Sequence, residues 1–308
     1  MTDWGLIAMR FALYADLMLL VGLAAFPLYS FTRAERDDGA VLPLAVTLTW
    51  LAFAGLIISA FGFALSSAAM MGISLAEIDA PMLLSMADET EQGAAWLVRT
   101  ASLTTAVAFL IAVRRRRSLQ YALALASGAV ALATLLWSGH AAATEGAIGT
   151  VHRISDIAHM TAGAVWIGGI AAFALLLHPR VHAQGAARLA LARRALADFA
   201  RVGTVAVAVI VVTGMVNGYA IFGADMAAMF VSTYGLLLAF KVALVAAMLL
   251  IAANNRWRLT PALEQAIDDL DSGTAWMRLR VSVALEATAA VMVLALVAWL
   301  GTLMPSNS

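Results

Sequence analysis

The chain of 308 residues has no cysteine. Disulfides, thiolate metal ligands and thiol redox chemistry are therefore excluded, and a metal ion would have to bind histidine, methionine, carboxylate or backbone oxygen. Charged residues are also scarce, at 12% of the chain, against roughly 25% in soluble domains. Because the 19 basic residues are balanced by 19 acidic ones, no basic surface is left over to bind nucleic acid.

Motifs of enzymes are missing as well. The sequence contains no phosphate-binding loop, no nucleophile elbow and no HExxH motif, which are the local signatures of nucleotide binding and hydrolysis. We therefore expect a protein that is not an enzyme and that binds no nucleotide.

Apolar residues are abundant instead. They make up 63% of the chain, and the mean hydropathy is +0.90, which indicates a polytopic protein in a lipid bilayer. The sequence predicts an all-α bundle of about eight transmembrane helices, forming a single integral membrane domain over residues 1–308. The predicted spans are Leu6–Phe31, Pro43–Ser67, Ala94–Val113, Leu119–Ser138, Ile154–Leu177, Val202–Phe222, Tyr234–Ala253 and Leu279–Leu303.

The segment Ala68–Gly93 is the largest loop on its side of the predicted bundle. Its apolar pieces are too short to cross a bilayer, so we expect a loop with one interfacial helix beginning near Pro81. The loop carries four methionines, which are Met70, Met71, Met82 and Met86.

Arginines predict the orientation, because short cytoplasmic loops are enriched in basic residues. With the N-terminus outside, fifteen of the 19 basic residues fall in cytoplasmic loops: Arg33, Arg36, Arg114, Arg115, Arg116, Arg117, Arg180, Arg188, Arg193, Arg194, Arg201, Arg256, Arg258, Arg278 and Arg280. Both termini are then periplasmic. His140, His152, His159 and the loop methionines, Met226 and Met229 included, gather at the outer face, whereas His178 and His182 lie inside.

A histidine-bearing stripe is predicted on the fifth span. His152, Asp156, His159, Gly163 and Trp166 are spaced so that a helix places them on one face. Imidazole and thioether groups together suit Cu(I), and imidazole also suits Cu(II). The two histidines are about 10 Å apart along the helix axis.

Each of these histidines therefore needs further ligands. The candidates are His140 and the methionines Met70, Met71, Met82 and Met86. We expect Asp156 to orient an imidazole by hydrogen bonding, with Trp166 beside it on the stripe. Alternatively, the histidines form hydrogen bonds to neighbouring helices.

Three further ionisable residues within predicted spans are candidates for a function, because an unpaired charge there costs at least ~2.5 kcal/mol. They are Lys241, Glu286 and Asp16. The natural pair is Lys241 with Glu286, although the two differ in depth, and Asp16 or Asn217 is an alternative partner. These residues are candidates for a pathway through the bundle.

Four ordered blocks resemble the CopD/PcoD copper-resistance family of bacterial inner-membrane proteins. They are HRISDIAHMTAGAVWIGGI (152–170), DFARVGTVAVAVIVVTGMVNGY (198–219), YGLLLAFKVALVAAMLLIAANNR (234–256) and LRVSVALEA (279–287), and the match extends to about residue 303. Upstream, AAMMGISL and WLVRT resemble longer members.

The resemblance implies copper homeostasis at the inner membrane and a multi-pass protein that moves copper toward the cytoplasm. It also implies a periplasmic copper-binding partner of the CopC kind. The family's histidines correspond to His152 and His159, and its charged intramembrane positions to Lys241 and Glu286.

Two other functions stay open at this point. One is a membrane haem protein for electron transfer, with His140 and His159 as axial ligands. The other is an assembly or sensor subunit that holds copper for a partner without transporting it.

Overall fold

The computed structural model describes residues 4–38, 42–138, 146–177, 186–223, 232–259 and 273–303, and within these ranges every regular element is helical. The long helices are α1 (Trp4–Ser30), α3 (Leu44–Met71), α5 (Glu91–Ala112), α6 (Arg117–Ala133), α7 (Gly146–Leu176), α9 (Ala186–Phe222), α10 (Thr233–Asn254) and α12 (Gly273–Leu300). The short elements are α2 (Arg33–Asp38), α4 (Ala80–Glu89), the 3₁₀ turn η1 (Thr134–Ser138) and the π-helical turn η4 (Asn255–Leu259).

The prediction of eight membrane spans is confirmed. Among the described residues, eight helices are long and apolar enough to cross a bilayer, one for each predicted run. The helix starts differ most from the predicted spans at α7, α9 and α12, which begin earlier, at Gly146, Ala186 and Gly273. The extension of α9 is rich in alanine, leucine and arginine, which favour a helix outside a bilayer as well as within it.

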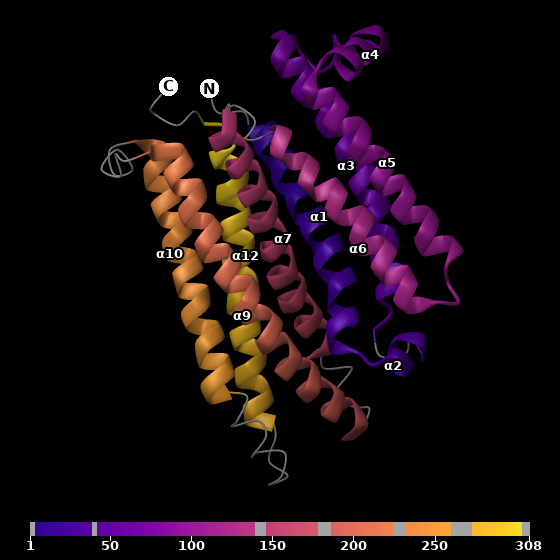
Figure 1. Cartoon of the computed structure of the whole chain (residues 1–308), viewed down its shortest axis with the longest axis vertical. Helices are drawn as coiled ribbons and strands as arrows, with labels where there is room; N and C mark the ends of the chain where they lie inside the picture. The colour runs from indigo at the N-terminus through magenta and orange to yellow at the C-terminus, as the bar shows by residue number, and fades with distance from the viewer. Residues whose placement is uncertain are drawn as a thin grey trace.

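Helix α1 forms the centre of the bundle. Leu17, Leu20 and Val21 on this helix are completely buried. Helices α3 and α6 pack on one side of α1, and α7 and α12 pack on the other (Figure 1). The N-terminal helix, predicted from its hydropathy as one ordinary span, therefore joins the two halves of the molecule.

Helices α1 and α7 cross at a pair of glycines. A Cβ atom added to Gly22 would lie 2.0 Å from the backbone oxygen of Ala164, and one added to Gly168 would lie 2.2 Å from the carbonyl carbon of Gly22. Small residues let two helix backbones approach this closely in a membrane, where van der Waals contact is a main source of helix association. The crossing holds α7 firmly against α1.

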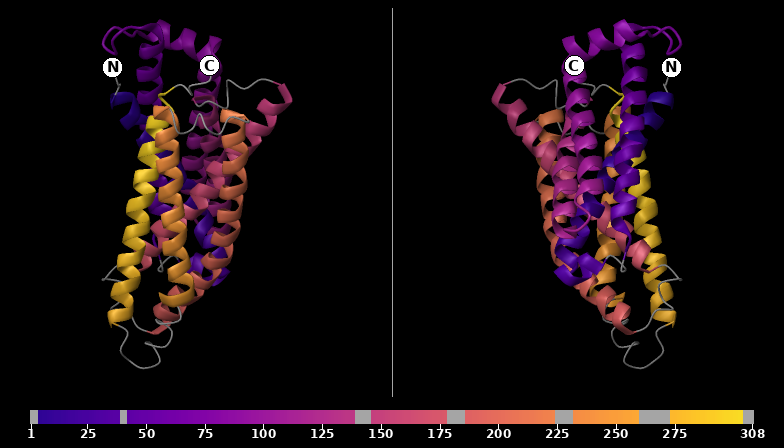
Figure 2. Two further views of the ribbon diagram at one scale, coloured as in Figure 1. Left: turned by 90° about the vertical axis from the view of Figure 1, so that its left-hand side faces the viewer. Right: turned by 90° about the vertical axis from the view of Figure 1, so that its right-hand side faces the viewer.

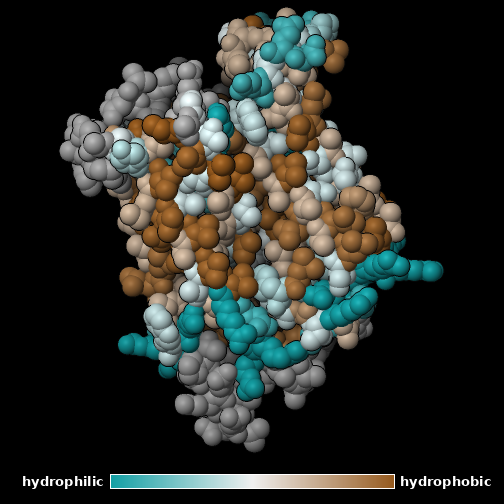
Figure 3. All heavy atoms as spheres, viewed as in Figure 1, coloured by the Kyte–Doolittle hydropathy of each residue, from teal (hydrophilic) through white to brown (hydrophobic). Residues whose placement is uncertain are grey.

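The two ends of the bundle differ in charge. Exposed arginines of the loops and helix ends gather at one end, as the hydrophilic residues at the lower end of Figure 3 show. Both chain termini lie toward the opposite end, which is the upper end in Figures 1 and 2. We call these the arginine-rich end and the terminal end.

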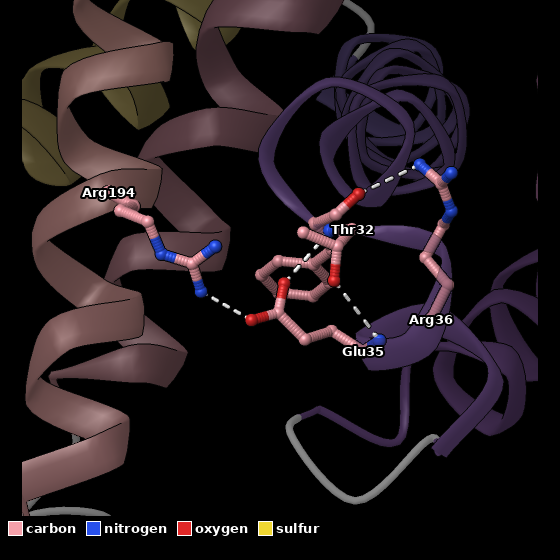
Figure 4. A network of polar contacts seen from close by, with 5 residues as sticks. Thr32, Glu35, Arg36 and Arg194 are labelled. Atoms are coloured by element: carbon pink, nitrogen blue, oxygen red, sulfur yellow. Dashed lines mark hydrogen bonds and ion pairs between the residues drawn. The ribbon is translucent and has the colours of Figure 1, made fainter.

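At the arginine-rich end, α2 ties α1 to α9 (Figure 4). Arg36 donates from Nη1 to the backbone oxygens of Pro27, Leu28 and Phe31, at 3.0, 3.1 and 2.9 Å. These carbonyls belong to the last turn of α1 and its end, where helix carbonyls lack partners of their own.

The first turn of α2 is a capping box. The Thr32 N–H donates to Glu35 Oε2 at 2.8 Å, and the Glu35 N–H donates to Thr32 Oγ1 at 3.4 Å. Glu35 Oε1 also accepts a hydrogen bond from Arg194 on α9. Partial burial opposes the charged form of Glu35, but these hydrogen bonds outweigh it, so the pKa of Glu35 lies below its usual value.

At the terminal end, the helix expected near Pro81 is present as α4. Asp79 caps it by accepting from the Met82 N–H at 2.8 Å. The helix packs closely on α5, since a Cβ atom on Gly93 would lie 2.2 Å from the Met86 backbone oxygen. In Figure 1, α4 and the adjoining ends of α3 and α5 project beyond the rest of the bundle.

Candidate functional site

The candidate site is a cavity of about 120 Å³ enclosed by α1, α7, α9, α10 and α12. We call it the central cavity. Its polar lining residues are Tyr14, Asp156, His159 and Lys241, and its thioether side chains are Met18, Met160 and Met248. The other lining residues are Gly163, Trp166, Ile167, Ile210, Val245, Ala290, Val293, Leu294 and Val297. Four polar side chains and three sulfur atoms are thus brought together in an otherwise apolar space.

Helix α7 supplies more of this lining than any other helix. Asp156, His159, Gly163 and Trp166 all face the central cavity, as the predicted stripe requires. His152 is buried, with 4% of its surface exposed, but it is absent from the cavity lining. It lies one turn before Asp156, toward the start of α7. The structure therefore separates the two predicted histidine ligands.

Thr213 is the hydrogen-bond neighbour of the His159 ring. The Thr213 hydroxyl is placed to donate to the backbone oxygen of Val209, one turn earlier in α9. His159 Nδ1 lies 2.9 Å from the oxygen of the same hydroxyl. We infer that the hydroxyl hydrogen is used within α9, so that Nδ1 carries the ring hydrogen and Nε2 keeps a free lone pair. This is the form of imidazole that binds a metal ion.

Asp156 was expected to orient an imidazole, but for His159 the partner is Thr213. Asp156 Oδ1 instead accepts from Asn217 Nδ2 of α9 at 3.3 Å. Lys241 of α10 lines the same cavity, and the charges of Lys241 and Asp156 act on each other. The central cavity thus contains one acidic and one basic residue.

Glu286 lies elsewhere. It accepts a hydrogen bond from Asn255 Nδ2, and the Asn255 side-chain oxygen accepts one from Ser282. This buried cluster lies where α10 passes into η4, nearer the arginine-rich end than Lys241 is. The structure does not bring Lys241 and Glu286 together, because Glu286 is absent from the central cavity and no ion pair between described residues joins the two.

Asp16 lies at a third position, apart from the central cavity and from the cluster around Glu286. It is 6% exposed, and its Oδ2 atom faces Gly55 of α3, where an added Cβ atom would lie 2.5 Å away. No hydrogen bond to this oxygen is formed within the described residues. Asp16 is therefore directed away from Tyr14 and Met18, the residues of α1 that line the central cavity.

The loop methionines lie outside the central cavity. Met70, Met71 and Met82 are exposed and Met86 is half-buried. Met70 lines a different cavity together with Arg10 and Arg99. The predicted candidates His140, Met226, Met229, His178 and His182 lie outside the described residues. Among those described, no group of three His, Asp or Glu residues is close enough to hold a metal ion.

Sequence reasoning missed four cavity residues that carry a hydroxyl or thioether group, and each carried a readable signal. Met160 follows His159 directly, and Met248 is seven residues after Lys241, which is two turns along the same face of α10. Tyr14 and Met18 are four residues apart on α1, so they also share a face.

Comparison with known proteins gives consistent matches over most of the chain. The family model "Copper resistance protein D-like, N-terminal domain" matches residues 1–150, and "Copper resistance protein D" matches residues 193–300. The chain is 43% identical over 302 residues to Copper resistance protein D of Pseudomonas syringae pv. tomato, covering 97% of this chain and 96% of that protein.

Two further relatives are more distant. Inner membrane protein YebZ of Escherichia coli (strain K12) is 27% identical over 304 residues, which cover 97% of this chain and 98% of that protein. Copper transport protein CutJ of Bacillus subtilis (strain 168) is 31% identical over 169 residues, which cover 54% of this chain and 30% of that protein. No solved structure matches the chain.

Proposed function

This chain belongs to the copper resistance protein D family of multi-pass inner-membrane proteins, and we propose that its central cavity binds copper during passage across the membrane. The observation that supports the proposal is that one histidine and three methionines line a single cavity. This ligand set favours Cu(I), and the imidazole also allows Cu(II). Binding and release require no covalent reaction by the protein, so we propose no enzymatic activity.

The charges in the cavity suit a monovalent cargo. Asp156 and Lys241 both line the cavity, and the formal charges of these two side chains sum to zero. Neutral imidazole and thioether ligands add no further charge in a region of low dielectric constant. Cu(I) adds a single positive charge close to the Asp156 carboxylate, and Asp156 thereby stabilises the bound ion.

We propose that copper enters from the terminal end. The arginine-rich end is the cytoplasmic one by the rule that basic residues stay inside, which makes both termini periplasmic. A periplasmic copper-binding partner of the CopC kind would then deliver the ion near α4, whose Met82 and Met86 lie on that side. From the central cavity, the buried cluster around Glu286 and Asn255 is the next polar group toward the arginine-rich end.

The haem alternative receives less support from the geometry. Two axial histidines must face one haem from opposite sides, at one depth in the membrane. The histidines within the described residues, His152 and His159, lie on one helix two turns apart. An optical spectrum of the purified protein distinguishes haem binding from copper binding, since bound haem gives a Soret band.

Uptake of radioactive copper into vesicles containing the purified protein tests the proposed transport. We expect copper supplied as Cu(I) outside to accumulate faster than in protein-free vesicles, and His159→Ala to abolish the difference. The matched control is Thr288→Val, which changes an exposed residue of α12. Copper binding without any uptake would instead favour a copper-holding subunit.

A further inference from the structure

A second cavity, of about 450 Å³, lies at the terminal end between α1, α3, α5 and η1. Arg10 and Arg99 both line it, and none of the lining residues that the structure describes is acidic. The rest of the lining combines the polar Ser66, Gln92 and Thr134 with apolar side chains. This cationic cavity shares no lining residue with the central cavity.

Arg99 is the better defined of the two cations. Arg99 is buried, with 6% of its surface exposed. Arg99 Nε donates to Ser59 Oγ at 2.8 Å, and Nη1 donates to Thr134 Oγ1 at 3.3 Å. Both partners are neutral hydroxyls, and the ion pairs between described residues do not include Arg99.

A buried guanidinium without a counter-charge is unfavourable, and more so inside a membrane. Asp16 does not supply the counter-charge, because its Oδ2 faces Gly55 and forms no hydrogen bond within the described residues. The position of Arg99 is therefore explained best by an anion that enters the cavity. The Arg99 guanidinium also disfavours a metal cation, although Met9 and Met70 are present in the lining.

We propose that the cationic cavity binds a phosphate-class oxyanion, either the head group of an anionic phospholipid or free inorganic phosphate. Guanidinium groups present forked donors that match the oxygens of phosphate, and such charge-assisted hydrogen bonds are strong. The apolar side chains of Leu6, Phe63 and Trp137 in the same lining would contact the glycerol and upper acyl carbons of a lipid. The site is independent of copper binding.

Thermal unfolding of the full-length protein in detergent tests this site. We expect the Tm to rise saturably with short-chain phosphatidylglycerol and not with a neutral glycoside detergent of equal chain length. Inorganic phosphate is compared with chloride at equal ionic strength. In Arg99→Gln the Kd should weaken about tenfold or more, whereas Arg115→Gln, an exposed residue of the other end, should bind as the wild type does.

The two ligands identify the source of the oxyanion. A shift with the lipid alone assigns the site to a phospholipid, and a shift with phosphate as well assigns it to a free oxyanion. No saturable shift with either ligand, or equal shifts in the wild type and Arg99→Gln, would overturn the proposal. If Arg99→Gln does not fold, the comparison of phosphate with chloride needs no variant.

Discussion

Nδ1 of His159 on α7 lies 2.9 Å from the hydroxyl oxygen of Thr213 on α9, within hydrogen-bond distance. A Cβ atom on the neighbouring Gly214 would lie 3.7 Å from the His159 ring, so α9 also limits the space beside the imidazole. One hydroxyl and one glycine therefore hold the ring with Nε2 available. The link between these helices determines whether the cavity can bind a soft metal ion.

Thr213→Val removes the hydroxyl and keeps the shape of the side chain. Without its acceptor, the ring loses its orientation and its preferred tautomer, and we expect the Cu(I) affinity to fall by about 10- to 100-fold. Competition with a chromogenic Cu(I) chelator measures the affinity. The matched control is Thr288→Val, which changes an exposed threonine that bonds only its own helix, through Ala284. An unchanged affinity in Thr213→Val would show that Thr213 does not orient the ligand.

The shared cavity of Lys241 and Asp156 predicts energetic coupling between them. Lys241→Met leaves the carboxylate without its balancing charge, so the double variant with Asp156→Asn should be more stable than the sum of the single effects predicts. We expect a coupling energy of about 1–3 kcal/mol from unfolding in detergent. Lys241→Met combined with Glu286→Gln is the control and should be additive, because Glu286 bonds Asn255 instead. Coupling to Glu286 alone would contradict the structure.

The Glu35–Arg194 link predicts a loss of stability in acid. The pKa of Glu35 is lowered in the folded protein from an ordinary value of 4.5. Its contribution is therefore complete above pH 4.5 and disappears as the pH falls through the lower folded pKa. Because Arg194 is half exposed, we expect about 0–1 kcal/mol. The measurement compares thermal unfolding of the wild type and Glu35→Gln at pH 7 and below pH 4. A difference that grows in acid would contradict this assignment.

The distribution of arginines predicts the topology in cells. A reporter fused after Arg117 or within residues 264–272 should be cytoplasmic, and one within residues 142–149 should be periplasmic. Reporter activities in the two compartments measure this directly. An inverted result at any of the three positions would contradict the eight-span orientation.

The number of spans could be predicted from the sequence because hydropathy depends on each segment alone. Helix boundaries were less predictable, since α9 begins at Ala186, well before its candidate membrane span at Arg193. The stripe of Asp156, His159, Gly163 and Trp166 was also predictable, because helical spacing fixes which residues share a face.

Partners across helices could not be predicted in the same way. The pairing of Lys241 with Glu286 follows from charge alone, but the depths of α10 and α12 place Glu286 beside Asn255. His152 shares its face of α7 with Asp156, so its separation from the cavity depends on depth along the helix, which is set by how the neighbouring helices enclose α7. The contact between Gly22 and Gly168, two residues far apart in the chain, is part of that packing.

The Cu(I) affinity of His159→Ala tests the central claim most directly. The sequence predicts similar losses for His152→Ala and His159→Ala, whereas the structure places only the second of these residues in the cavity lining. Measured by chelator competition on the purified protein, His159→Ala should weaken Cu(I) binding by about 100-fold or more, and His152→Ala, the matched control, by less than about tenfold. Unchanged affinity in His159→Ala, or a larger loss in His152→Ala, would contradict copper binding in the central cavity.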